Sequence, residues 1–162
     1  MAQPPAITVR PYRDADLDAV ISVFLASIRE IAIRDYSQAQ IAAWAQVDRN
    51  TWKQARSDRP TWVALDSESI PEKIIGFAGL QPNSHLDMMY VHPSHQRHGV
   101  ASALLSTVEQ AAKESGISTL TVDASLTARP FFEKHGFKII RQQKVPIQGQ
   151  FLRNLHMSKT LS

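Results

Sequence analysis

The apolar residues in the first third of the chain follow two different periods. Apolar and polar residues alternate over 7–10, which predicts a short strand. The segments that follow have apolar residues at helical spacing, and Asp14 or Asp16 is placed to cap the first of them. The predicted helical segments are 17–28, 37–44 and a further turn over 51–56.

Short apolar runs separated by glycine, proline and polar turns fill the remainder of the chain. The predicted strands are 61–65, 74–80, 85–91, 118–124, 137–145 and 151–159, and the predicted helices are 102–115 and 127–135. Strands in series, followed by a strand–helix–strand order, predict an α/β (α+β) fold with a mixed sheet flanked by helices.

Length and composition indicate a single domain over 1–162. Hydrophobic residues make up 43% of the chain and charged residues 20%, which is typical of a globular protein that buries a sizeable core. The chain contains no cysteine. A disulfide framework, a thiolate metal site and a cysteine nucleophile are therefore excluded.

The net charge of +3 raises nucleic-acid binding as a hypothesis. Because the basic residues are scattered, with no cluster of five or more, this hypothesis is kept only as an alternative. The first six residues have neither the charged nor the apolar region of a signal peptide, and no apolar run reaches the length of a membrane span. We expect a cytoplasmic monomer or homodimer with neither nucleic acid nor a membrane as partner.

The most informative motif lies between the predicted strand 85–91 and the helix that follows it. A glycine at the start of a helix leaves backbone N–H groups free, and the helix dipole favours negative charge there. A phosphate, or a diphosphate, is the expected ligand. Gly99 and Ala101 permit close approach to the backbone, and Arg97 and His98 add donors at the rim. The motif is Gln96-Arg97-His98-Gly99-Val100-Ala101.

The order Gln-x-x-Gly-x-Ala after a Val-x-Pro strand end resembles the acetyl-CoA pyrophosphate loop of the GNAT superfamily of N-acetyltransferases. A second block, the predicted strand 121–125 followed by 128–137, is similar to the Phe-Tyr-x-x-x-Gly-Phe helix ending of that family. The resemblance is specific over 74–137 and looser over 7–63. It implies a single GNAT domain whose sheet is splayed at the acetyl-CoA site.

The same resemblance implies acetyl-CoA as acetyl donor and no metal. It places the pantetheine arm against the backbone of three consecutive residues, with the Met89 N–H as the oxyanion donor. The side chains of Met89 and Val91 are equally consistent with ordinary core packing. The residues that the resemblance assigns to acetyl-CoA are Met89, Tyr90, Val91, Gln96, Arg97, His98, Gly99, Val100, Ala101, Ser125 and Phe132.

Two candidates for the general base follow from strand alternation. His85, Asp87, Met89 and Val91 alternate along one predicted strand, so they are expected to share the face that lines the acyl-CoA cleft. A histidine accepts a proton near neutral pH, whereas an aspartate needs burial or a bridging water. The alternatives are a surface histidine beside a turn for His85 and an ion-pairing or capping residue for Asp87.

The general acid is where the chain departs from the family pattern. The family often has tyrosine at the position of Phe132, which has no proton to donate, and asparagine at the position of Ser125. Three explanations are open. Tyr36, Tyr90 or Ser125 protonates the thiolate, or the thiolate leaves unassisted or with a proton from water, or the chain binds acyl-CoA without efficient turnover.

Three histidines at three-residue spacing, His92, His95 and His98, raise a metal site as a hypothesis. Pro93 and Gly99 favour a loop rather than a helix there, and the resemblance already assigns this loop to phosphate. We therefore predict no metal.

The acceptor side is less defined. By the resemblance, the first helices wall the acceptor cleft, and Tyr36 and Trp44 are candidates for an aromatic wall or for core packing. The polar and aromatic residues that these helices offer are Arg29, Glu30, Arg34, Asp35, Tyr36, Trp44 and Asp48. We predict direct acetyl transfer to a primary amine in a ternary complex. The alternatives are a non-catalytic acyl-CoA sensor on the same fold and the basic nucleic-acid-binding domain.

Overall fold

The structure, a computed structural model, describes residues 6–162. Residues 1–5, which carry most of the segment in which no signal peptide was expected, lie outside the described part. Within the described residues, no helix combines the length and the apolar character that crossing a bilayer requires.

A seven-stranded mixed sheet forms the centre of the molecule, in the order β1-β2-β3-β4-β5-β7-β6. Every neighbouring pair is antiparallel except β4 and β5, which are parallel. The strands are β1 (Ile7–Pro11), β2 (Thr61–Asp66), β3 (Lys73–Leu80), β4 (His85–Val91), β5 (Thr119–Ser125), β6 (Lys138–Ile147) and β7 (Gln150–Thr160). The predicted strands and the mixed α/β class are confirmed.

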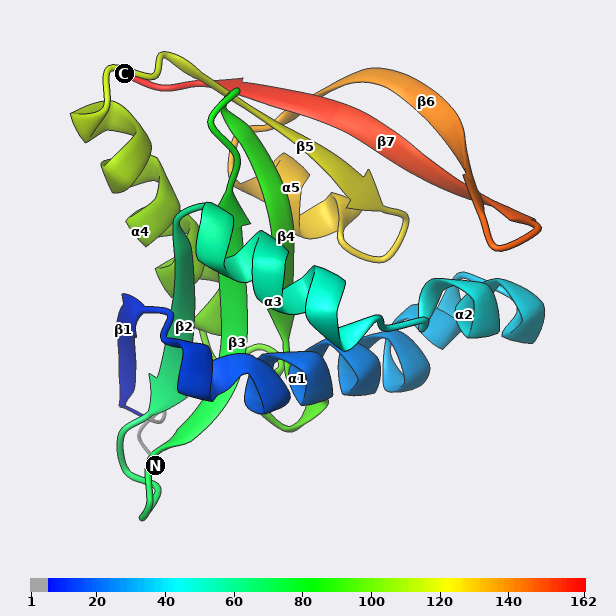
Figure 1. Cartoon of the computed structure of the whole chain (residues 1–162). Coiled ribbons are helices and arrows are strands. Elements are labelled where there is room, and N and C mark those ends of the chain that lie inside the picture. The colour runs from blue at the N-terminus through cyan, green and yellow to red at the C-terminus, as the bar shows by residue number, and fades with distance from the viewer. Residues whose placement is uncertain (1–5) are drawn as a thin grey trace.

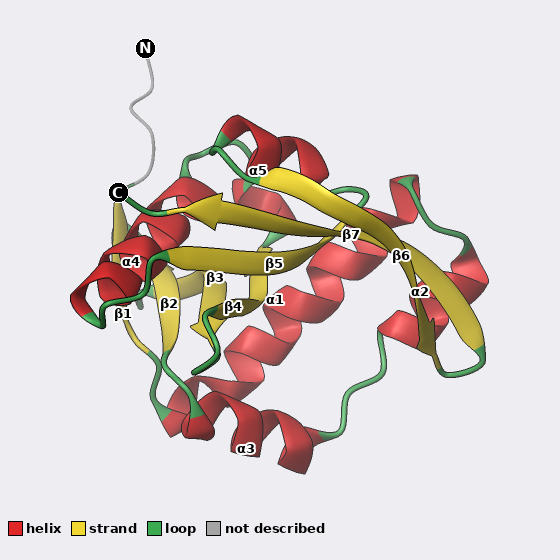
Figure 2. Ribbon diagram, turned by 90° about the horizontal axis from the view of Figure 1, so that it is seen from above, coloured by secondary structure: helices red, strands yellow, loops and turns green. Residues whose placement is uncertain are grey.

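Five α-helices flank the sheet, and Figure 2 shows α1 and α3 on one side of it with α5 on the other. They are α1 (Leu17–Glu30), α2 (Gln38–Trp44), α3 (Arg49–Asp58), α4 (Val100–Glu114) and α5 (Arg129–Lys134), with 3-10 turns at Asp14–Asp16, Ala32–Arg34 and Pro93–His95. The predicted helices are confirmed, although 51–56 is part of a full helix whose N-cap, Asp48, accepts a hydrogen bond from the Thr51 N–H. Helix α4 begins two residues before the predicted 102.

The two faces of the sheet carry separate hydrophobic cores. One core packs α4 and α5 against the sheet around Leu104 and Phe132, and the other packs α1 and the aromatic ring of Trp52 against Phe77. Gly76 on β3 permits the close approach of α4, because a Cβ atom there would lie 3.0 Å from Val100 Cγ1. Both cores hold β4 in place between the helix layers.

Strands β4 and β5 separate along their length, as Figure 1 shows. Only His85 with Thr121 and Leu86 with Val122 are paired between them in the described chain. Beyond Leu86 the edge of β4 that faces β5 is therefore free of a strand partner. This divergence is the feature that positions the candidate site.

Candidate functional site

A cavity of about 790 Å³ opens where β4 and β5 diverge. It extends from the loop before α4, past β4 and the start of α5, to α1, α2 and the β6–β7 hairpin. The volume is in the range of pockets that hold small ligands and cofactors.

Strand β4 presents free backbone groups to this cavity. The His92 N–H donates to the Ile75 carbonyl at 2.7 Å, so the peptides of alternate residues on β4 face β3. The N–H groups of Met89 and Val91 then face the opposite way, toward the gap left by β5. A ligand lying along β4 can pair with them as a strand would.

The loop before α4 has the conformation that the sequence motif predicts. Gly99 adopts a left-handed conformation with φ of 82°, and Arg97 adopts one with φ of 63°. No atom lies within 4 Å of the Cβ position of Gly99, so the backbone is open to an approaching group. The Ala103 N–H makes the first bond of the helix, to the Gly99 carbonyl, which leaves the preceding N–H groups to face an anion.

The expected sharing of one face by His85, Asp87, Met89 and Val91 is wrong, because β4 contains a bulge. Gly79 pairs with Met88 but Leu80 pairs with Leu86, so Asp87 is the extra residue on β4. Met89 and Val91 consequently pack on the α4 side of the sheet. The side chains of His85 and Asp87 lie on the opposite, α3 side.

Asp87 is held by two guanidinium groups. Its Oδ2 accepts hydrogen bonds from Arg56 Nη2 at 2.7 Å and Arg59 Nη1 at 2.6 Å, and its Oδ1 accepts one from Gln81 Nε2 at 3.2 Å. The Arg56 side chain is only 1% exposed, so it depends on Asp87 for charge compensation. Asp87 lines the cavity, and its ion-pairing alternative is what the structure shows.

His85 belongs to a second polar cluster at the point where the strands diverge. Its Nδ1 lies 2.8 Å from Thr121 Oγ1, and its Nε2 lies 3.5 Å from Asp123 Oδ2. The other oxygen of Asp123 lies 2.7 Å from His156 Nδ1 on β7. Asp123 lines the cavity, whereas His85 is not among its lining residues.

The two tyrosines among the candidate proton donors, Tyr36 and Tyr90, are both hydrogen-bonded. The Tyr36 hydroxyl donates to the Arg153 carbonyl at 2.5 Å and accepts from the Leu126 N–H at 3.0 Å, and burial raises its pKa above the ordinary value. Burial also raises the pKa of Tyr90, against a hydrogen bond with Trp44 that acts in the other direction. Both phenols therefore hold their protons tightly.

Phe132 is 3% exposed and packs against the rings of Phe131 and Phe137, with one edge at the cavity. Ser125 Oγ accepts a hydrogen bond from the Ala128 N–H at 3.0 Å and so closes the turn into α5. Both residues line the cavity.

The three histidines at three-residue spacing are engaged in protein contacts, and His92 and His95 both bond to the Ser94 hydroxyl. His92 Nδ1 accepts from the Ser94 N–H, and His95 Nε2 lies 3.1 Å from Asp66 Oδ2. His98 lies against His95, with ring centroids 5.7 Å apart. Among the residues that the structure describes, no group of three potential ligands is arranged to hold a metal ion.

Most of the residues that the sequence assigned to the site line one cavity. His85 and His98 are not among the lining residues. The predicted residues that line it are Asp87, Met89, Tyr90, Val91, Gln96, Arg97, Gly99, Val100, Ala101, Ser125 and Phe132. Tyr36 and Trp44 also line it, as the aromatic-wall prediction requires.

Sequence reasoning missed Asp123 and Asn154, which face the cavity from β5 and β7. The alternation of Thr121, Asp123 and Ser125 with apolar residues was a usable signal for the first of them. The chain offered no comparable signal for Asn154, because its strand faces the cavity only after β7 pairs with β5.

Comparison with known proteins identifies relatives over almost the full length. The family model described as "Acetyltransferase (GNAT) domain" matches residues 32–161. The chain is 37% identical over 151 residues to the uncharacterized N-acetyltransferase YafP of Escherichia coli K12. This match covers 93% of this chain and 94% of the relative.

Solved structures agree with this relationship. The crystal structure of a GCN5-related N-acetyltransferase from Rhodopseudomonas palustris, named as an aminotransferase of class II, is 34% identical to the chain with a TM-score of 0.91. The match covers 99% of this chain and 98% of that chain. PaiA N-acetyltransferase from Thermoplasma acidophilum, solved in complex with coenzyme A, has a TM-score of 0.73 at 21% identity. The match covers 96% of this chain and 99% of the PaiA chain. The second likeness concerns the fold alone.

Proposed function

We propose that this chain acetylates a primary amine directly within a ternary complex. The premise is that the chain belongs to the GNAT acetyltransferase family and is an acyltransferase with acetyl-CoA as donor. The observation that carries the proposal is the cavity that joins the free edge of β4 to the Gly99 loop. The absence of cysteine removes the usual acyl-carrying side chain and favours direct transfer.

The donor end of the cavity fits the chemistry of acetyl-CoA. The open backbone at Gly99 and the first N–H groups of α4 would receive the diphosphate, with Arg97 at the rim. Gln96 Nε2 donates to the Val91 carbonyl at 3.1 Å and so ties this loop to the end of β4. The N–H groups of Met89 and Val91 would pair with the pantetheine amides and the thioester oxygen.

The Met89 N–H is our candidate for the oxyanion donor. It is a fixed dipole facing the gap between the strands, and such a preorganised donor stabilises the charge that develops on the thioester oxygen. Because a backbone group is involved, the side chain of Met89 is free to pack in the core.

Of the two candidates for the base, we favour His85 acting through Asp123. Asp87 already accepts two guanidinium hydrogen bonds, so a proton delivered to it would disrupt a buried ion pair. His85 Nε2 lies 3.5 Å from Asp123 Oδ2, and Asp123 faces the cavity. A proton from an ammonium at Asp123 therefore has a short path to an imidazole.

The leaving thiolate is proposed to depart without a tyrosine donor. A thiol has a reference pKa near 8.5, whereas the pKa values of the buried phenols Tyr36 and Tyr90 are raised above their ordinary value of 10. Transfer from either phenol would be uphill, so we propose that the thiolate leaves unassisted and then receives a proton through water in the cavity.

A non-catalytic acyl-CoA sensor is the second candidate, favoured by Phe132 at the position where the family often has tyrosine. Steady-state thiol release with acetyl-CoA and an amine panel separates the two functions. Direct transfer predicts intersecting initial-rate patterns and no acetylated protein by mass spectrometry. Acetyl-CoA binding with no turnover of any amine would favour the sensor, and a stable acetyl-enzyme would contradict direct transfer.

A further inference from the structure

The charges that line the cavity are separated between its two ends. Arg97 and Lys134 are the only lysine or arginine residues among its described lining residues, and they lie on the loop before α4 and at the end of α5. The adjacent His135 Nε2 lies 3.1 Å from Ser102 Oγ in the first turn of α4, which places the end of α5 at the phosphate loop. The positive charge is therefore at the donor end.

The opposite end is apolar and aromatic. Tyr36 and Trp44 contact each other edge to face with ring centroids 5.4 Å apart, and Trp44 lies 6.5 Å from the ring of Tyr90. The charged residues at the end of α1 and in the turn after it do not line the cavity; they are Arg29, Glu30 and Arg34. The aliphatic residues that complete this end are Ile28, Ile31, Ala32, Val145, Ile147 and Leu152.

Asp123 is the carboxylate that remains for a ligand between the two ends. Its side chain is 41% exposed and lies between His156 Nδ1 at 2.7 Å and His85 Nε2 at 3.5 Å. An imidazole, unlike the guanidinium groups on Asp87, is not a permanent cation. Asp123 can therefore receive the ammonium group of an acceptor.

Asn154 supplies a second group for the same ammonium. Its Oδ1 is buried and has no hydrogen-bond partner, and Asn154 lines the cavity. On β7 it pairs with Ser125 while His156 pairs with Asp123, so Asn154 and Asp123 are diagonal neighbours on one face. A buried acceptor atom without a partner is costly, and a ligand N–H would satisfy it.

We infer that the acceptor is a small primary amine on an apolar, preferentially aromatic body without a carboxylate, with its ammonium bound by Asp123 and Asn154. This inference rests on the proposed function. The aromatic residues at the far end would contact the body of the acceptor. Among the described lining residues, the cations Arg97 and Lys134 lie at the donor end, and the other carboxylate, Asp87, is already bound by two guanidinium groups.

With the ammonium at Asp123, acetyl transfer accounts for both protons that the nitrogen loses. One ammonium proton passes to the Asp123–His85 pair, and the freed nitrogen electron pair forms the bond to the thioester carbon. The C–S bond then breaks with its electron pair on sulfur, and the second nitrogen proton passes through a water molecule to the thiolate.

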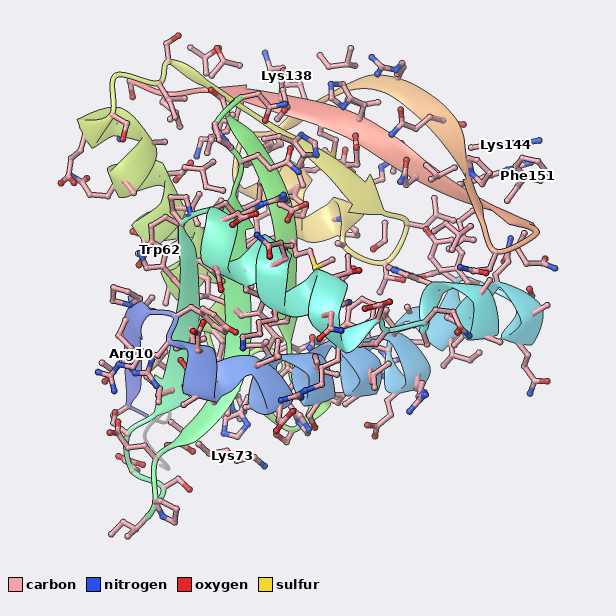
Figure 3. All side chains as sticks on the ribbon, in the orientation of Figure 1. Arg10, Trp62, Lys73, Lys138, Lys144 and Phe151 are labelled. Atoms are coloured by element: carbon pink, nitrogen blue, oxygen red, sulfur yellow. The ribbon has the colours of Figure 1, made fainter. Side chains whose placement is uncertain are left out.

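A separate hollow lies outside this end. Its charged lining residues are Lys144, Arg153 and Asp35, Phe151 also lines it, and among the described residues it shares only Tyr36 with the main cavity. Figure 3 shows Lys144 and Phe151 together at the outer end of the β6–β7 hairpin. The Tyr36 hydroxyl bonds to the Arg153 carbonyl and the Leu126 N–H, so this ring stands between the two spaces.

The test compares thiol release with 2-phenylethylamine, hexylamine, L-phenylalanine and spermidine. We expect kcat/KM for 2-phenylethylamine to exceed that for L-phenylalanine and spermidine by roughly a hundredfold or more, because L-phenylalanine brings its α-carboxylate beside Asp123 and spermidine places a further ammonium in the apolar end. Preference for L-phenylalanine or spermidine would overturn the inference while leaving N-acetyl transfer intact.

Calorimetric binding of the same amines to protein saturated with coenzyme A gives a readout that does not need turnover. Preferential binding of 2-phenylethylamine without turnover would support the acceptor class and contradict the proposed activity. Absence of both binding and turnover for the aromatic amine would overturn the acceptor class, and absence of turnover for all four amines would also contradict the proposed activity.

Matched variants assign the effect to the two residues. Asp123→Asn should lower kcat/KM for 2-phenylethylamine by about a hundredfold, and Asn154→Ala by about tenfold, with acetyl-CoA affinity unchanged. Asp58→Asn, an exposed position on α3 outside the cavity, is the control and should leave both values unchanged. Wild-type kinetics in Asp123→Asn would contradict the ammonium site.

Discussion

His156 Nδ1 lies 2.7 Å from Asp123 Oδ1 across the β5–β7 pair, one residue past the last pairing of β5 with β4. An ionised carboxylate only accepts hydrogen bonds, so His156 is the donor. This contact fixes the carboxylate at the point where the cavity begins.

If His156 positions Asp123, His156→Ala should raise KM for the amine about tenfold while kcat falls less, since the carboxylate loses orientation but keeps its charge. His156→Asn, which retains a short donor, should recover part of the loss. Steady-state kinetics of both variants check this, and an equal fall of kcat with unchanged KM would exclude a positioning role.

The proposed base makes a second prediction. His85→Ala should lower turnover by roughly a hundredfold, the usual contribution of a positioned base, and added imidazole should restore part of it. Acetyl-CoA affinity measured by calorimetry is the control and should not change. A His85→Ala enzyme with wild-type turnover would remove His85 from the mechanism.

Asp87 is predicted to matter for stability first. Asp87→Ala leaves the buried Arg56 guanidinium, whose Nε and Nη1 already have no partner, without its carboxylate. The free energy of unfolding should fall by about 3 kcal/mol. Urea denaturation measures it. A double variant with Arg56→Met should recover much of the loss, and unchanged stability in Asp87→Ala would show that the ion pair contributes little.

The ion pair between Arg10 and Asp16, which lies outside the site, is predicted to make the stability of the protein depend on pH. Burial opposes ionisation of Asp16, but the hydrogen bonds from Arg10 Nη1 and Nη2 and from the Arg13 N–H outweigh it and lower its pKa. A lowered folded-state pKa means that the stabilisation is present above the unfolded pKa of about 3.9 and is lost as pH falls through the folded value.

The stability difference between wild type and Asp16→Asn should therefore be largest above about pH 4 and shrink in more acidic buffer. Urea denaturation at a series of pH values measures it. A difference that stays constant down to the most acidic buffer would contradict the lowered pKa.

Phe132 is predicted to pack rather than to take part in proton transfer. Phe132→Leu keeps an apolar wall and should retain most turnover, while Phe132→Tyr should raise turnover only if thiolate protonation is rate-limiting. A thousandfold loss in Phe132→Leu, with acetyl-CoA affinity and stability intact, would mean that the ring itself has a catalytic role.

The sequence predicted the element order and the Gly99 loop because both depend on local signals: apolar periodicity, and a glycine ahead of a helix. The faces of β4 were mispredicted because a bulge at Asp87 is set by pairing with β3, and strict alternation does not include it. Asn154 was missed because its position at the cavity depends on the long-range pairing of β7 with β5. Local patterns thus identified the donor end, and the acceptor end required tertiary structure.

The most direct measurement of the central claim is calorimetric titration of acetyl-CoA into Gly99→Glu, with Gly116→Glu as matched control. Both glycines have left-handed φ, 82° and 78°, and open space at the Cβ position, so both substitutions carry the same backbone strain and charge. Only Gly99 lines the cavity. We predict loss of binding in Gly99→Glu and wild-type affinity in Gly116→Glu. Unchanged affinity in a folded Gly99→Glu protein would contradict the assignment of this loop to the diphosphate.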